Sequence, residues 1–170
     1  MCHFITIGVH KRHFEAAQGL VPRGFQAFLA TNPFVLRTLP ADFKTFLLVS
    51  GGCSCGLYRR PGSTPARVSD TEPLRKKYEK LGWSTGKIER AIEQAESSHV
   101  DPEHFCGYRA DVCEVITEIV GIASSVAVLV HFYDGLVDNE SIEFGEPKRI
   151  HIEQLRKIEP EEDRWLWLRG

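Results

Sequence analysis

Two cysteines and three glycines lie close together in residues 50–56, which read SGGCSCG. Thiolates bind zinc at about 2.3 Å, and glycine lets a loop wrap closely around an ion. Cys2 near the start of the chain and His131 in a later apolar run offer two further ligands of the types that zinc prefers. These residue types predict a metal site, with zinc as the candidate ion, made by Cys2, Cys53, Cys55 and His131.

The same thiols could instead act as nucleophiles. Cys2 would become an N-terminal nucleophile if Met1 were removed, and Cys53 or Cys55 could work with His131 as a base. A reactive thiol needs a pKa lowered by a cation or a helix N-terminus, which a sequence does not show. A metal- or thiol-dependent enzyme centred on this loop is therefore one functional hypothesis, and a tight turn with incidental thiols is the simplest alternative.

The other two cysteines, Cys106 and Cys113, are seven residues apart on one predicted helix. That spacing separates them by about 10 Å along the helix axis, too far to form a disulfide or share an ion. Cys113 is typical of a small buried apolar residue. An odd total of five cysteines indicates free thiols or ligands rather than a disulfide framework.

Acidic side chains border aromatic ones in the segment after residue 131. Acids beside aromatics suit a surface that caps a basic site on another protein, because complementary charge steers encounter and buried aromatics hold the contact. The leading functional hypothesis is therefore a bacterial interaction protein, for example an immunity-type protein that neutralises a partner toxin by occluding its active site. The predicted contact residues are Phe132, Tyr133, Asp134, Asp138, Glu140 and Glu143.

Four short segments resemble a loosely known group of uncharacterised bacterial proteins: Met-Cys-His-Phe at the start, Gly-Gly-Cys-Ser-Cys-Gly in the loop, Leu-Gly-Trp-Ser-x-x-Lys-Ile in the middle and His-Phe-Tyr-x-Gly late in the chain. The resemblance carries no established activity. It implies that the four segments belong to one design, in which Cys2, Cys53, Cys55 and His131 meet in space.

Charge and composition limit the functional classes. The net charge of −2 argues against a general nucleic-acid binder, although residues 1–90 carry +8 and residues 91–170 carry −10. The first residues lack the basic start of a secretory signal. The longest uncharged stretch, residues 119–133, is shorter than the roughly 20 apolar residues of a membrane span. A cytoplasmic location without membrane contact is expected.

Periodicity and turn residues predict the secondary structure. Alternating or continuous apolar runs predict strands, and Asp134-Gly135 marks a turn between two of them. The predicted strands are residues 2–9, 25–30, 43–49, 125–133, 141–144, 149–152 and 165–168.

Helices are predicted in the middle of the chain. Two short ones are expected at 13–18 and 33–39, the second capped by Asn32 with Pro33 at its first position. Residues 70–81 and the segment after Ser84 favour a plain helical hairpin over a DNA-binding one, because carboxylates on the second helix would repel phosphates. Asp101-Pro102-Glu103 predicts the start of a third main helix. The order of elements predicts one α+β domain over residues 1–170, with three main helices on a mostly antiparallel sheet.

Overall fold

The computed structural model describes residues 2–59, 72–97 and 107–170. The chain divides into two compact units. The larger comprises Met1–Pro61 and Cys106–Gly170, and the smaller comprises Gly62–Phe105. Length alone predicts a single domain, and each unit is described here by itself.

The larger unit is built on a six-stranded sheet of order β2-β3-β1-β6-β8-β7. Every neighbouring pair is antiparallel except β7 and β8, which are parallel. A mostly antiparallel sheet with helices confirms the α+β class. The strands are β1 (Cys2–His10), β2 (Gln26–Leu29), β3 (Phe43–Val49), β6 (Ser125–Tyr133), β7 (Lys148–His151) and β8 (Leu166–Arg169).

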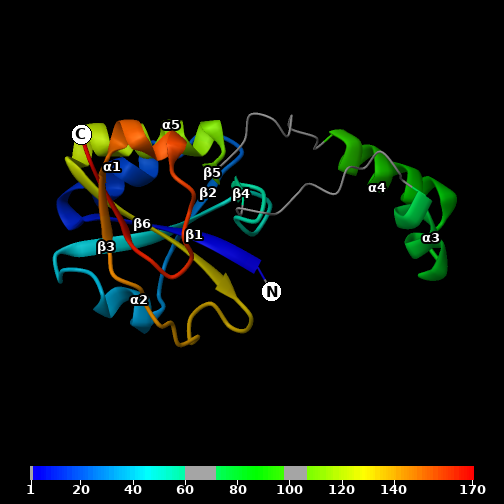
Figure 1. Ribbon diagram of the computed structural model, residues 1–170, viewed down its shortest axis with the longest axis horizontal. Coiled ribbons are helices and arrows are strands. Elements are labelled where there is room, and N and C mark those ends of the chain that lie inside the picture. The colour runs from blue at the N-terminus through cyan, green and yellow to red at the C-terminus, as the bar shows by residue number, and fades with distance from the viewer. Residues whose placement is uncertain (1, 60–71, 98–106) are drawn as a thin grey trace. The chain divides into compact units, whose positions relative to one another are not determined.

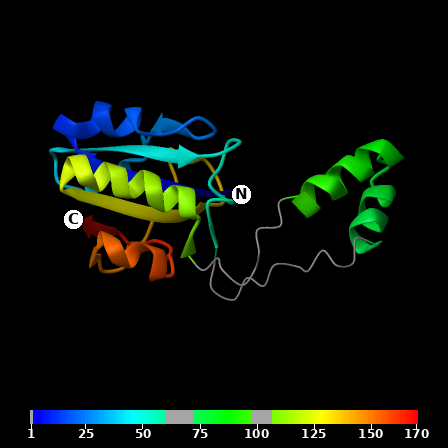
Figure 2. The same cartoon turned by 90° about the horizontal axis from the view of Figure 1, so that it is seen from above.

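The central strand β1 is apolar on both faces, which is why it lies in the interior of the sheet. Ile5, Ile7 and Val9 on one face are fully buried. They pack beneath α1 (Phe14–Gly19), α5 (Ala110–Ala123) and the 3-10 segment η2 (Ile152–Lys157). Figures 1 and 2 show these helices along one side of the sheet.

The other face of the sheet carries a second core cluster. Val35 of α2 (Pro33–Arg37) packs there with Leu129 and Trp165, and Trp167 lies against the same cluster. Both tryptophans therefore lie on this face of the sheet. Asn32 caps α2 as predicted, since its side-chain oxygen accepts hydrogen bonds from the N–H groups of the next helical residues.

Two predicted elements are wrong. Residues 141–147 form no strand, because the place beside β6 is taken by β8 from the end of the chain. Their apolar side chain Ile142 is buried in the second core cluster instead.

The third main helix begins at Ala110 rather than near residue 101. Gly107 has φ +101° and lies in a short strand, β5 (Gly107–Tyr108), paired with β4 (Tyr58–Arg59). Residues 101–106 fall outside the described part of the chain.

The described part of the smaller unit is a helical hairpin. Its helices are α3 (Glu72–Lys80) and α4 (Thr85–Ser97), joined through Gly82 at φ +71°. Trp83 stacks on Tyr78 with ring centroids 4.5 Å apart, and the Lys87 ammonium lies 4.0 Å from the Trp83 ring centre. This arrangement agrees with the predicted plain hairpin.

Candidate metal centre

The glycine loop begins with a tight turn at the end of β3. The N–H of Ser50 donates to the carbonyl of Cys53 at 2.9 Å. Between them Gly51 and Gly52 have φ of +67° and +99°, a region that side-chain-bearing residues rarely adopt. The two glycines therefore turn the chain back so that the following residues face β1.

Ser54 fixes this loop to the sheet. Its side chain is fully buried, donates to the carbonyl of Leu48 at 2.5 Å and accepts from the N–H of Ile5 at 2.9 Å. Its own N–H donates to the carbonyl of His3 at 2.8 Å. One serine thus joins the end of β3 to the start of β1. Because Ser54 points into the protein, Cys53 and Cys55 on either side of it are held at the surface.

The thiols of Cys2, Cys53 and Cys55 converge at this end of the sheet. All three sulfur atoms lie within 4.8 Å of one another, and together they could hold a metal ion. Cys55 is exposed, while the other two are half-buried. Tetrahedral zinc with bonds of about 2.3 Å needs sulfurs about 3.8 Å apart, so small side-chain rotations are enough to close the site.

Hydrogen bonds separate the acidities of two of these thiols. The N–H of Cys55 donates to the sulfur of Cys53 and, with the S–H groups of Cys55 and Cys2, lowers the Cys53 pKa despite partial burial. Burial raises the pKa of Cys55 to about 11, helped by the neighbouring thiols and opposed by the N–H of His3, which donates at 3.3 Å. Without metal, Cys53 is therefore the first of the pair to ionise.

This difference predicts an order of alkylation in metal-free protein. Because the thiolate is the nucleophile, Cys53 should react with iodoacetamide at a lower pH than Cys55, whose reaction rises only as the pH approaches about 11. Peptide mass spectrometry after timed labelling at a series of pH values measures both rates. Equal rates at every pH, or faster reaction of Cys55 near neutrality, would contradict the prediction.

His131 does not belong to the group of three cysteines. In the β1–β6 pairing Cys2 lies opposite Tyr133, and His131 lies opposite Phe4, two residues further along the strands. Its Nδ1 contacts the carboxylate of Asp163, and its Nε2 lies 3.6 Å from Glu140. The ring is thus directed at carboxylates, and the predicted four-ligand set reduces to three ligands.

The predicted partner-binding residues are spread between the interior and the surface. Tyr133 is only 2% exposed, and Glu140 accepts hydrogen bonds from the N–H groups of Asp134 and Gly135. These N–H groups and the nearby His131 lower the pKa of Glu140, with the Gly135 bond as the largest cause. Asp134, Asp138 and Glu143 are exposed, and Phe132 is half-buried. The interaction hypothesis remains a prediction.

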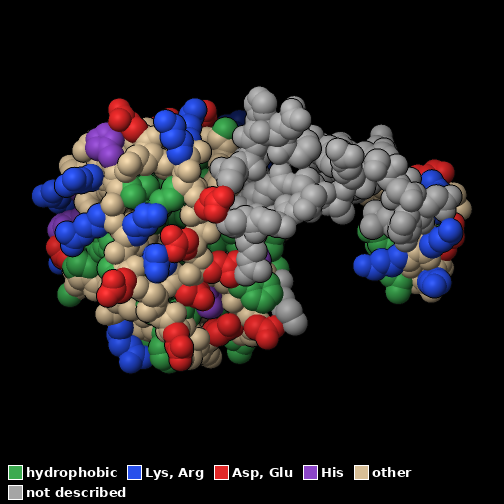
Figure 3. Space-filling view, viewed as in Figure 1, with side chains coloured by type: hydrophobic (Ala, Val, Ile, Leu, Met, Phe, Trp, Pro, Cys, Tyr) green, Lys and Arg blue, Asp and Glu red, His purple; other side chains and the backbone are tan. Residues whose placement is uncertain are grey.

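Burial and then the charges of Glu140, Asp138 and Asp163 raise the pKa of Tyr133 to about 12, so its phenol keeps its proton near neutrality. On the face of the larger unit seen in Figure 3, acidic side chains lie mostly toward the right and basic side chains mostly toward the left.

Of the two remaining cysteines, only Cys113 lies in the described part of the chain, and its predicted burial is confirmed. Cys113 is 1% exposed within α5, and burial raises its pKa to about 11. It is an ordinary core residue. Cys106 lies outside the described residues.

Three residues important to this region escape prediction from sequence. Ser54 stands between the two cysteines in the sequence, but nothing in the sequence shows that its side chain is buried, because the burial depends on the loop geometry. Glu162 accepts hydrogen bonds from the His3 ring at 3.0 Å and the Tyr58 hydroxyl at 3.1 Å, and its neighbour Asp163 contacts His131. Both acids come from a charged run near the end of the chain, far in sequence from their partners.

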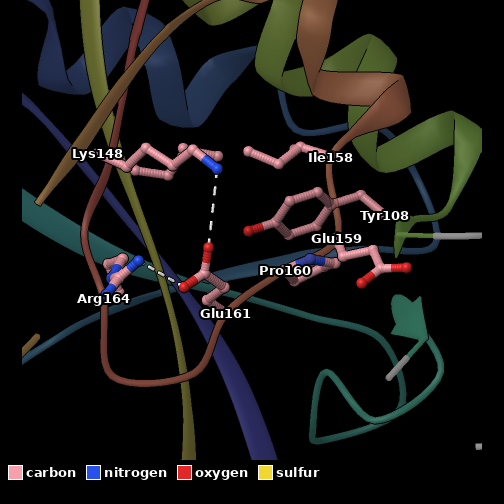
Figure 4. A pocket seen from close by; sticks show the side chains of 8 residues that line it. Tyr108, Lys148, Ile158, Glu159, Pro160, Glu161 and Arg164 are labelled. Carbon is pink, nitrogen blue, oxygen red and sulfur yellow. Dashed lines mark ion pairs between the residues drawn. The ribbon is translucent and has the colours of Figure 1, made fainter. Parts of the chain in front are cut away.

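Two hollows elsewhere in the larger unit offer less chemistry. The first, lined in part by Tyr108, Ile158 and Lys148, holds about 10 Å³, which is room for about one water. Dashed lines in Figure 4 join Glu161 to Lys148 and to Arg164. These ion pairs measure 3.7 Å and 2.6 Å.

The second hollow, of about 510 Å³, lies at the end of the sheet opposite the cysteines. It is lined by Pro40, Ser124, Ser125, Arg149, Trp167, Leu168 and Arg169. It contains no cysteine, histidine or carboxylate, so the cysteine cluster is the stronger candidate site.

Comparison with known proteins adds no assignment: no protein-family model, curated protein or solved structure matches the chain. Among the described residues, no helix has both the length and the apolar character needed to cross a membrane.

Proposed function

We propose that this protein is a zinc-dependent protein whose metal is held by the thiolates of Cys2, Cys53 and Cys55. The convergence of three sulfur atoms within 4.8 Å carries the proposal. Soft thiolate ligands favour zinc and copper(I) over magnesium or calcium. The buried hydrogen bonds of Ser54 support it further, because they hold two of the ligands in place before the ion arrives.

Three protein ligands favour a reactive over a purely structural role. Structural zinc sites usually have four protein ligands, whereas catalytic zinc sites have three and keep one position for water or substrate. Here Cys55 is exposed, so a fourth ligand can approach from solvent. Bound zinc would supply Lewis acidity at this position. This supports the metal-dependent enzyme hypothesis centred on the glycine loop.

Titration with Co²⁺, which takes the place of zinc and is coloured, tests the proposal. In reduced protein an intense sulfur-to-cobalt charge-transfer absorption in the near ultraviolet should saturate at one equivalent of Co²⁺, and Zn²⁺ should abolish it. Protein with its accessible thiols alkylated should not show this band. Absence of the band from reduced, folded protein would reject the three-thiolate site.

A further inference from the structure

His131 has a buried ring nitrogen with no hydrogen-bond partner in the part of the chain that the structure describes. The side chain is 8% exposed, and Nε2 has no hydrogen-bond partner among the described residues. A buried polar group without a hydrogen bond loses its hydration without compensation, so such groups are rare and usually have a reason.

The other ring nitrogen of His131 contacts the carboxylate of a residue whose backbone has an unusual conformation. Nδ1 contacts Asp163, whose φ of +60° is unusual for a residue other than glycine. The N–H of Asp163 donates to the carbonyl of Val130 at 2.9 Å, which fixes the backbone beside β6. A carboxylate on one imidazole nitrogen orients the ring and fixes its tautomer, as is usual for histidines that bind metals.

A second carboxylate stands opposite the unpaired nitrogen. Glu140 Oε1 lies 3.6 Å from Nε2, which is longer than a hydrogen bond. Two metal–ligand bonds of about 2.1 Å at the tetrahedral angle span about 3.4 Å, so a small side-chain rotation lets both groups bind one ion. The N–H groups of Asp134 and Gly135 bind this carboxylate at 3.2 and 2.8 Å, so it is already held in place.

We propose that His131 Nε2 and Glu140 form a second metal site, for a divalent transition-metal ion, with Asp163 as the residue that positions the imidazole. Nitrogen and oxygen ligands suit zinc, cobalt or nickel. Tyr133 packs edge-on against the His131 ring at 4.3 Å, and its buried hydroxyl also lacks a partner among the described residues. That hydroxyl can donate a hydrogen bond to a water on the ion.

The ion can reach this site from solvent. The side chains of Glu140 and Asp163 are 22% and 40% exposed, so only the histidine is deeply buried. The site shares no residue with the cysteine cluster and does not depend on it. The competing explanation is an imidazolium that donates to both carboxylates with no metal involved.

Zinc titration of a protein carrying Cys2→Ser, Cys53→Ser and Cys55→Ser tests the second site alone. Calorimetry should find one bound Zn²⁺, and ¹⁵N spectra of the histidine side chains should show the Nε2 resonance of His131 moving to the metal-bound range. Glu140→Gln should weaken binding at least about 10-fold, and Asp163→Asn about 10- to 100-fold.

His3→Gln is the matched control, because His3 also pairs with a carboxylate but lies opposite Phe132 on the other face of the sheet. It should leave the affinity unchanged. Failure of Zn²⁺ to bind, an unchanged His131 resonance, or equal affinity in Glu140→Gln would overturn the proposal in favour of the imidazolium. None of these results bears on the cysteine site, which the serine variant lacks.

Discussion

Replacing Cys53 with serine is expected to weaken zinc binding by about 100-fold or more. Structural zinc sites gain about 10–16 kcal/mol from four ligands, so one ligand is worth roughly 3 kcal/mol, and serine does not ionise to replace the thiolate. Cys53 carries the thiol whose pKa is lowered by its neighbours, so it is the most readily deprotonated of the Cys53–Cys55 pair. Competition with a chromophoric chelator measures the affinity.

Cys113→Ala provides the matched control for this loss. It also removes a thiol, but one in the core of the larger unit on α5 that is not part of the three-cysteine group. Its zinc affinity should stay within about twofold of the original protein, even though its stability falls. A Cys53→Ser protein that binds zinc as tightly as the control would show that this sulfur is not a ligand.

Replacing Ser54 with alanine is expected to destabilise the larger unit by about 2–3 kcal/mol. The change removes two buried hydrogen bonds, to Leu48 and from Ile5, each worth about 1 kcal/mol, and it leaves their buried backbone partners poorly satisfied. The midpoint of denaturant-induced unfolding measures the loss. Zinc affinity should fall as well, since the loop that carries Cys53 and Cys55 is no longer fixed to β1.

Ser50→Ala separates this effect from a general intolerance of the loop. Its hydroxyl makes one long bond of 3.3 Å to the carbonyl of Gly24, so the expected destabilisation is below about 0.5 kcal/mol. If the Ser54 and Ser50 variants lose the same stability, the loop is not anchored through Ser54.

Most elements of the larger unit could be predicted because local patterns and long-range packing agree. The apolar run of β1 and the cap of α2 at Asn32 each carry a signal that does not depend on distant residues. Prediction failed where a distant segment decides the outcome. Residues 141–144 alternate like a strand, but β8 occupies the place beside β6.

The site could be predicted in part for the same reason. Cys53 and Cys55 lie in one short loop that follows β3. Cys2 begins β1, which pairs with β3. His131 lies outside the three-cysteine group, because its position depends on the register of β1 against β6 and on an acid 32 residues further along the chain. The register of β1 against β6 cannot be derived from the residues near His131. The left-handed backbone of Asp163 cannot be derived from the residues beside it.

X-ray absorption at the zinc edge tests the central claim most directly when the protein carries Glu140→Gln, which weakens the proposed His131 site, and is loaded with one equivalent of zinc. The expected first shell has three sulfur atoms at about 2.3 Å and one nitrogen or oxygen atom at about 2.0–2.1 Å. A first shell without sulfur, or with fewer than two sulfur atoms per zinc, would contradict a centre made by Cys2, Cys53 and Cys55.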